Sequence, residues 1–371
     1  MKNGEQKREQ SELDTIDVVK DFFLGDFVFG ELTYTPINSD IKSNLELADC
    51  IINYGNNVIA FQIKGRKGLP KPNGDMSWVV NHIKGAKDQL VSTFDQLINN
   101  SIPVFQNKKG DSFNIKPKGI FIGIIVLQNN AMTSYKRVLS CKRLNGKVHC
   151  FSYTDFKLCC EKLILPQDIM DYLLYREGKY QIDREFDISE EIMVDAFLMK
   201  KYQTTNFNEE NLNIFRWILN MYRERLIEDE DISNYREIME AMLQLDRLGV
   251  EVFTSSLGKI MKYAKEKIKT EDICITPLTQ NGTSILFMSD TEMREKYMIF
   301  VTDLFMYKTK SEKCLTVYLY FTDEENFNIY WYYKEQKWTY DKEKARICYM
   351  PEIKGKWIPN KQAVGLVPAN E

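Results

Sequence analysis

Apolar positions in the first half of the chain recur with two different periods, which predict alternating helices and strands. From residue 11 they recur every three or four positions, the period of an amphipathic helix. This first helix carries Leu13, Ile16, Val19, Phe22 and Phe23. A β-prone segment, 27–36, follows it, and then come two short strands separated by Gly55-Asn56, a pair that suits a tight hairpin loop.

The elements after the hairpin complete one domain. A loop rich in Gly and Pro, 65–74, leads into a long amphipathic helix that ends near Asn100. The nearly unbroken apolar run 118–126 is typical of a central strand that is buried on both faces. A further strand is expected at 148–153, and helices at 155–163 and 167–175. This order of elements predicts an α/β domain over residues 11–180.

The second half of the chain has a different pattern. Residues 176–186 are polar and charged, which predicts a linker and a second domain over residues 187–371. Helices are expected at 189–202, 208–227, 232–247 and 255–269. Strands rich in Tyr, Phe and Trp are expected at 284–288, 297–307, 314–322 and 328–338, before an extended tail at 356–368. This pattern predicts an α+β domain, in which we find no catalytic motif.

Composition limits the class of protein. The chain has 371 residues, 44% of them hydrophobic, enough for two domains with cores of their own. A formal net charge of -3 excludes a strongly basic nucleic-acid-binding protein, so any such binding must come from local patches. The eight cysteines have no Cys-x-x-Cys spacing, and no apolar leader or membrane-length run is present. We therefore expect a soluble cytoplasmic protein with reduced thiols and no membrane partner.

Polar side chains gather at one end of the hairpin. With Gly55-Asn56 as the loop, Asp49 on the first strand lies opposite Gln62 on the second. Because side chains alternate between the two faces of a strand, Lys64 shares a face with Asp49 and Gln62. The sequence therefore predicts that a carboxylate, an amide oxygen and an ammonium meet at one place.

Oxygen ligands of this kind suit Mg²⁺ or Mn²⁺. We expect Asp49, Gln62 and the backbone carbonyl of Ile63 to hold the ion, with Glu46 binding through water or a second ion. Such an ion can stabilise charge on a reacting phosphodiester and activate a water, and Lys64 can orient that water or contact the phosphate. An acid of the first helix is expected to complete the site, and the sequence does not choose among Asp14, Asp17 and Asp21.

An acid at the start of one strand and Gln-x-Lys at the end of the next resemble the pattern of the PD-(D/E)XK, or restriction-endonuclease-like, nucleases. In that family the acid and the second acidic or Gln position bind Mg²⁺, and the Lys is catalytic. The resemblance assigns these roles to Asp49, Gln62 and Lys64. It covers about residues 11–180 and implies a central mixed sheet flanked by helices.

Further runs and two departures refine this resemblance. The runs Glu46-Leu47-x-Asp49, Asp26–Phe29 and Asp171–Arg176 look like those of uncharacterised bacterial nuclease-like proteins, some of them linked to phage defence. No Pro precedes Asp49, and Gln62 replaces the second acid, as in active members related to Mrr-type restriction enzymes. The Gln removes one negative charge, which weakens metal binding.

A second Glu-x-Lys in the chain serves as a control for the motif. Glu335 and Lys337 follow an acidic turn, Asp323-Glu324-Glu325. If the chain turns at Glu324-Glu325, Glu335 faces Cys314 and the acids lie at the far end of the strand. We therefore expect a nuclease-like arrangement only at the first hairpin.

Basic residues beside the hairpin are candidates for phosphate contacts. The candidates are Arg66, Lys67 and Lys71 in the loop and Lys87 on the following helix, where Lys84 and Gln89 could face the same cleft. A solvated loop and a solvated helix face are the alternative interpretations. His82 and His149 are too far apart in sequence to suggest a metal pair, so we expect both to be structural or on the surface.

Three functions remain compatible with the sequence. The first is a Mg²⁺-dependent endonuclease acting on nucleic acid, with DNA favoured, whose second domain selects substrate, senses a signal or forms a homo-oligomer. The second is a nucleic-acid-binding protein on a nuclease scaffold without catalysis, which the Gln in place of an acid favours. The third is a structural or partner-binding protein that works through its second domain.

Overall fold

The structure is a computed structural model of the chain. It describes residues 10–23, 27–34, 45–54, 57–65, 75–99, 105–106, 112–113, 119–128, 137–144, 146–180, 188–225, 234–266, 270–275, 282–290, 292–321 and 327–349. The chain divides into two compact units, Met1–Thr205 and Asn206–Glu371.

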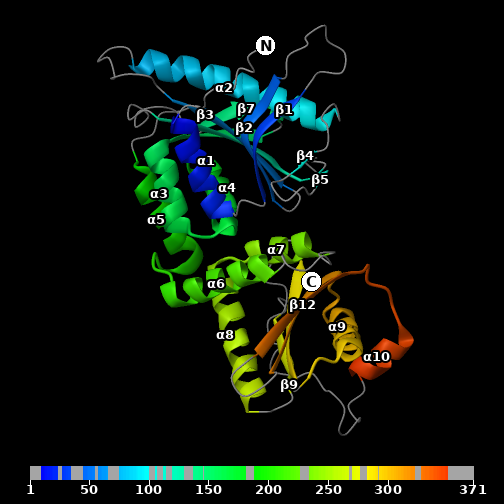
Figure 1. The fold of residues 1–371 in the computed structure, drawn as a ribbon. Coiled ribbons are helices and arrows are strands. Elements are labelled where there is room, and N and C mark those ends of the chain that lie inside the picture. Colours follow the sequence, from blue (N-terminus) through cyan, green and yellow to red (C-terminus); the bar gives the residue numbers. More distant parts are fainter. Residues whose placement is uncertain are drawn as a thin grey trace. The chain divides into compact units, whose positions relative to one another are not determined.

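Strand β3 (Asn57–Lys64) lies inside the main sheet of the first unit (Figure 1). It pairs antiparallel with β2 (Leu45–Tyr54) on one edge and parallel with β6 (Phe121–Leu127) on the other. The described strands follow the order β1-β2-β3-β6-β8-β7, with β1 at Val28–Tyr34, β7 at Val138–Cys141 and β8 at Gly146–Ser152. Because β3 and β6 have neighbours on both edges and are buried, their sequences are almost continuously apolar.

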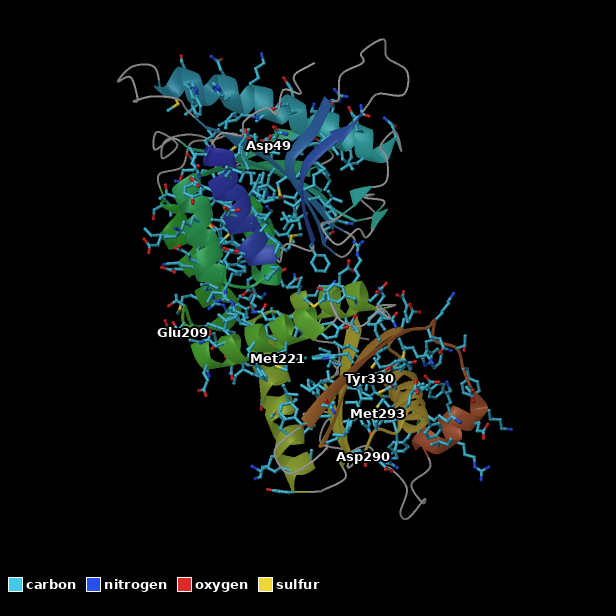
Figure 2. The ribbon with its side chains drawn as sticks, in the orientation of Figure 1. Asp49, Glu209, Met221, Asp290, Met293 and Tyr330 are labelled. Atoms are coloured by element: carbon cyan, nitrogen blue, oxygen red, sulfur yellow. The ribbon has the colours of Figure 1, made fainter. Side chains whose placement is uncertain are left out.

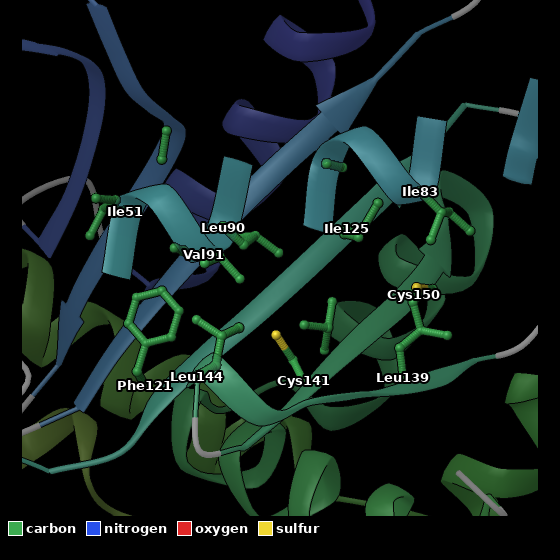
Figure 3. Close-up of a cluster of buried hydrophobic side chains, with 14 of the residues drawn as sticks. Ile51, Ile83, Leu90, Val91, Phe121, Ile125, Leu139, Cys141, Leu144 and Cys150 are labelled. Carbon is green, nitrogen blue, oxygen red and sulfur yellow. The ribbon is translucent and has the colours of Figure 1, made fainter. Parts of the chain in front are cut away.

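Helices cover both faces of this sheet. The long helix α2 (Asp75–Ile98) packs on β2, β3 and β6 over an apolar core that includes Ala60 (Figure 3). The next residue, Phe61, points to the other face and meets Phe156 of α3 (Tyr153–Leu163) edge to face. This alternation along one strand separates the two layers of core. Helix α1 (Gln10–Phe23) also contacts β3 and α3.

Local signals in the sequence fix where the next helices begin. The hydroxyl of Ser152 accepts a hydrogen bond from the backbone N–H of Asp155 at 3.0 Å and so caps α3. Pro166 occupies the first turn of α4 (Pro166–Lys179), where its missing N–H costs nothing. The remaining short elements are β4 (Phe105–Gln106) paired with β5 (Ser112–Phe113), and the 3₁₀ turn η3 (Lys142–Leu144).

A buried ion cluster joins α4 to α5 (Glu190–Tyr202) and to the sheet. The Arg176 guanidinium is fully buried and donates to Glu190 Oε1 at 2.7 Å and to the Cys150 carbonyl on β8 at 2.9 Å. Arg137 donates to Glu190 Oε2 at 2.6 Å, and the Tyr172 hydroxyl donates to Oε1. Burial alone disfavours the Glu190 carboxylate, but the two guanidiniums and these hydrogen bonds outweigh it and lower its pKa to about 2.

This cluster corrects the expected linker. Residues 176–186 were expected to separate the domains, yet Arg176 lies in the core and α5, expected in the second domain, packs on α3 and α4. Lys162 of α3 also forms ion pairs with Glu191 and Asp195 of α5. The compact units therefore divide after Thr205 and not near residue 186. Residues 181–187 lie outside the described part of the chain.

The second unit is a smaller α/β sandwich. Its described sheet has the order β12-β11-β10-β9, in which β10 (Thr283–Asp290) and β11 (Lys313–Phe321) are parallel and both outer pairs are antiparallel. The outer strands are β9 (Thr270–Ile275) and β12 (Phe327–Glu335). Helices complete the unit: α6 (Glu209–Arg225), α7 (Tyr235–Leu243), α8 (Arg247–Lys265), α9 (Glu295–Thr309) and α10 (Lys342–Tyr349). Helix α8 packs on β9, β10 and β11, and α9 packs on β10 and β11.

The expected strand 297–307 is wrong, because these residues lie within helix α9. Its aromatic and β-branched residues favour a strand locally, but the buried ones, such as Met298, Val301 and Phe305, recur at helical spacing and pack on the sheet. Parallel strands β10 and β11 also need a crossover connection, and α9 provides it. Tertiary packing thus overrides local propensity.

The control hairpin in this unit has a different register from the one expected. Glu335 pairs with Lys313 and not with Cys314, because Phe321 pairs with Phe327 across a connection with an odd number of residues. The acidic turn at 323–325 lies outside the described residues. The conclusion drawn from the control is unchanged, since the residue opposite Glu335 is a lysine and not an acid.

The expected fold class is confirmed at the level of architecture. The first unit is a mixed α/β domain in which a mixed sheet of six described strands is flanked by helices. The second unit, expected to be α+β, has a second, smaller sheet with helices, and its strands β10 and β11 are parallel. Across the described residues, no helix is both long and apolar enough to cross a membrane. The expected tail at 356–368 lies outside the described residues.

We predict that Glu190→Gln destabilises the first unit by about 3 to 5 kcal/mol, since it removes the counter-ion of the buried Arg176 and leaves Arg137 with Asp155 alone. The native pKa of Glu190, about 2, is below the ordinary 4.5. The stabilisation from the ionised carboxylate is therefore complete above about pH 4.5 and is lost as the pH falls towards 2. Urea unfolding between pH 3 and pH 7 should show this loss in the native protein and not in the variant.

Glu191→Gln is the matched control, because it removes the neighbouring carboxylate, which is exposed and pairs with Lys162 at 3.0 Å. We expect it to change stability by about 1 kcal/mol or less. Equal losses in the two variants would contradict a special role for the buried cluster.

Candidate functional site

The candidate site is at the end of the β2–β3 hairpin that is remote from its loop. Cys50 pairs with Phe61 and Tyr54 pairs with Asn57, which is the register that places Asp49 across from Gln62. The predicted register is therefore confirmed, although the loop residues Gly55 and Asn56 lie outside the described part. Figure 2 labels Asp49 in the first unit.

Three polar side chains meet where the register predicts. The Lys64 ammonium donates a hydrogen bond to the Gln62 amide oxygen at 3.0 Å and lies 3.7 Å from Asp49 Oδ2. The same carboxylate oxygen accepts the backbone N–H of Ile63 at 2.5 Å. A carboxylate thus binds a main-chain group of the next strand, at the point where the pairing of β2 with β3 ends.

The carbonyl of Ile63 is on the side of the strand where Asp49 lies. The Ile63 N–H points to Asp49, and in an extended strand the N–H and C=O of one residue point the same way. The next carbonyl, that of Lys64, accepts the N–H of Gln128 beyond β6, on the opposite edge. The Ile63 oxygen is therefore directed towards the edge that carries the Asp49 carboxylate.

The contacts of Asp49 are important for stability because the carboxylate is buried. Asp49 and Gln62 are almost fully buried, whereas the Lys64 side chain is 20% exposed. A buried carboxylate requires compensating charge and hydrogen bonds, and the Ile63 N–H and the Lys64 ammonium supply them. The site therefore pairs one buried carboxylate with one ammonium, and it is open to solvent on the side of the lysine.

The residues present fit a hard divalent cation in donor type. Asp49, Gln62 and the Ile63 carbonyl all offer oxygen, the atom that Mg²⁺ and Mn²⁺ prefer. The position between Asp49 and Gln62 already accommodates a positive charge, that of Lys64. No group of three or more His, Cys, Asp or Glu side chains that could hold a metal occurs among the described residues. Among the described side chains at this point, Asp49 would supply a carboxylate oxygen and Gln62 an amide oxygen, beside the Ile63 carbonyl and water.

The acids of the first helix that were expected to complete the site are exposed or partly exposed. Helix α1 buries its apolar face, while Asp17 and Asp21 are exposed. Asp14 accepts a hydrogen bond from Gln10 on the same helix at 2.7 Å. The expected completion of the site by one of these acids stays a prediction. The Glu46 side chain, the other expected acidic ligand, lies outside the described part of the chain.

The candidate phosphate contacts are described only in part. Arg66, Lys67 and Lys71 lie outside the described residues. Lys87 is half-buried on α2 and donates to the Ser140 carbonyl of β7 at 2.7 Å, a contact that ties helix to sheet. Lys84 and Gln89 are exposed on the same helix. Phosphate binding by these residues stays a prediction.

The two histidines have structural contacts. His82 stacks on Trp78 within α2. His149 is fully buried in β8, where its Nε2 lies 3.2 Å from Glu177 Oε1 and its Nδ1 lies 3.4 Å from a nitrogen of Arg176. Burial lowers the pKa of His149, so it is neutral at pH 7 and its unprotonated Nδ1 can accept from the guanidinium.

Sequence reasoning missed polar clusters in both units. The Arg176–Glu190 cluster is one, and its only signal was a pair of isolated charges beside apolar helix faces. In the second unit, buried Asp290 at the end of β10 accepts hydrogen bonds from Arg294 and, at 3.2 Å, from the Tyr318 hydroxyl. Burial raises the pKa of Tyr318 to about 12, so the tyrosine keeps its proton. These partners satisfy one another.

Comparisons with known proteins do not assign the chain to a family. It matches no model of a protein family, no curated protein and no solved structure. What the site can do therefore follows from its own side chains.

We predict that Asp49→Ala speeds hydrogen exchange at the Ile63 amide and destabilises the first unit by about 1 to 3 kcal/mol, because a buried N–H loses its acceptor. Asp49→Asn keeps an acceptor oxygen and should cost less. Exchange measured by NMR or mass spectrometry, together with urea unfolding, checks both.

Asp95→Ala is the control, since Asp95 forms a more exposed ion pair with Arg143. It should leave exchange at Ile63 unchanged. Unaltered Ile63 exchange in Asp49→Ala would contradict the hydrogen bond that joins the two strands.

Proposed function

We propose that the first unit is a metal-dependent nuclease domain of the PD-(D/E)XK type that hydrolyses phosphodiester bonds, with DNA as its substrate. One observation carries the proposal: Asp49, Gln62 and Lys64 converge at the end of two paired strands, with 3.0 Å and 3.7 Å separating the ammonium from the two oxygens. The mixed sheet flanked by helices also agrees with what the resemblance implies.

The residues of the hairpin have distinct roles in this proposal. Asp49, Gln62 and the Ile63 carbonyl would hold Mg²⁺ or Mn²⁺. When bound, such an ion supplies charge neutralisation on the phosphate and a more acidic water. Lys64 then stabilises the negative charge that develops on the phosphate, because its ammonium is the partly exposed cation of the site. The hydrogen bond from Ile63 to Asp49 fixes the carboxylate before substrate binds.

Gln62 lowers the affinity that we expect the site to have for a divalent cation. An uncharged amide in place of a second carboxylate leaves the site with less negative charge for a divalent cation. The same feature favours the second candidate function, in which the domain binds nucleic acid without cleaving it. The third candidate, a partner-binding protein, depends on the second unit alone.

The test is cleavage of plasmid DNA, and of RNA, with Mg²⁺, with Mn²⁺ and with a chelator. We predict metal-dependent cleavage that falls by about 100-fold or more in Lys64→Ala, because charge on the transition state loses its stabilising partner. Asp49→Asn should show a similar loss.

Lys162→Met is the matched control, since Lys162 is also a partly exposed, ion-paired lysine of the first unit but lies on α3. It should cleave at the native rate. Binding of nucleic acid without cleavage in every protein would favour the second function, and neither binding nor cleavage would leave the third. Cleavage that survives Lys64→Ala would overturn the assignment of Lys64.

A further inference from the structure

The Lys64 ammonium lies among the oxygens that would hold the metal ion. It donates to Gln62 Oε1 at 3.0 Å and lies 3.7 Å from Asp49 Oδ2. A bound Mg²⁺ needs oxygen ligands at about 2.0 to 2.1 Å. The hydrogen bond from Lys64 therefore uses the same amide oxygen that the ion would use.

Electrostatic repulsion disfavours binding of the Lys64 ammonium and a divalent ion to Asp49 and Gln62 at the same time. Asp49 and Gln62 are almost fully buried, so screening between charges beside them is weaker than in water. Of the side chains Asp49, Gln62 and Lys64, Asp49 alone carries a negative charge, and both cations would use it. An ammonium held by that carboxylate and a divalent ion bound to it would repel each other.

The Lys64 side chain is exposed and flexible enough to move away from Asp49 and Gln62. Its side chain is 20% exposed, against 5% for the side chain of Asp49, and Lys64 is the last residue of β3. A lysine has a flexible stem of four carbons, so its ammonium can leave the two oxygens without moving the strand. Asp49 would keep its bond to the Ile63 N–H throughout.

We propose that Lys64 closes the metal site in the metal-free protein and that the ion and the ammonium compete for Asp49 and Gln62. This inference rests on the proposed function. Binding of the ion turns the ammonium out towards solvent, which is the side from which a phosphate would approach. The site therefore has two states, one bridged by Lys64 and one open, and metal favours the open state. Reciprocally, removing the lysine must strengthen metal binding.

Binding of Mn²⁺ alone, measured by titration calorimetry and by the electron paramagnetic resonance signal of the free ion, tests the competition. The full-length chain is compared with Lys64→Met, Lys162→Met and Asp49→Asn. We expect Lys64→Met to bind Mn²⁺ more tightly than the native protein by about tenfold or more, while it loses cleavage. Lys162→Met removes the same charge from an ion pair on α3 and should bind with native affinity.

The outcomes separate this inference from the proposed function. Equal or weaker Mn²⁺ binding in Lys64→Met, with binding that still requires Asp49, would overturn the competition and leave the nuclease proposal standing. Binding that is absent from the native protein and from Lys64→Met, or unaffected by Asp49→Asn, would overturn both. An equal gain of Mn²⁺ affinity in Lys162→Met would show that the change in net charge causes the tighter binding, and it would overturn the competition.

A second measurement uses the native chain and needs no variant. Lysines are labelled briefly with an amine-reactive acylating reagent, with and without Mn²⁺, and each position is quantified by mass spectrometry. We expect labelling of Lys64 to rise several-fold with Mn²⁺, because the released ammonium is more accessible. Lys162 serves as the internal reference. Unchanged labelling of Lys64 at saturating Mn²⁺ would overturn the two-state site.

Discussion

The register of β3 is the constraint on which the candidate site depends. Its antiparallel pairing with β2 sets Asp49 across from Gln62, and its parallel pairing with β6 fixes the same strand from the other edge. A slip of one residue would send Lys64 and Gln62 to the opposite face. Such a slip would also exchange the core side chains of β3 between its two buried faces, so that Phe61 would take a place packed for Ala60. Core packing and the geometry of the site are thus enforced by the same pairing.

Much of this arrangement could be predicted because it is encoded locally. Alternating faces and a two-residue loop are enough to bring Asp49 and Gln62 together. The failures concern interactions that are distant in sequence. Arg176 looked like part of a polar linker, since its partner Glu190 and its carbonyl acceptors are brought close only by the fold. Residues 297–307 have strand-like composition, but packing on parallel strands makes them a helix. The control register at Glu335 failed because the length of its loop was misjudged.

Two of the buried carboxylates in the first unit, Glu190 and Asp49, have contrasting surroundings. Glu190 is surrounded by two guanidiniums and tyrosine hydroxyls, which hold it ionised and permanently paired. Asp49 has a main-chain N–H and an ammonium that stands farther away, on a flexible stem that reaches solvent. The first arrangement is suited to hold helices together. The arrangement around Asp49 lets another cation replace the Lys64 ammonium, as a binding site requires.

The buried cluster also defines the smallest piece of the chain that can stand alone. A fragment that ended at residue 180, where the sequence suggested a domain boundary, would keep Arg137 and Arg176 in its core but lack Glu190. Arg176 would then be buried without its counter-ion, Arg137 would keep only Asp155, and the surfaces of α3 and α4 that α5 covers would be exposed. The autonomous unit therefore includes α5. The boundary of the domain is set by charge neutrality of its interior, at a position that composition alone does not mark.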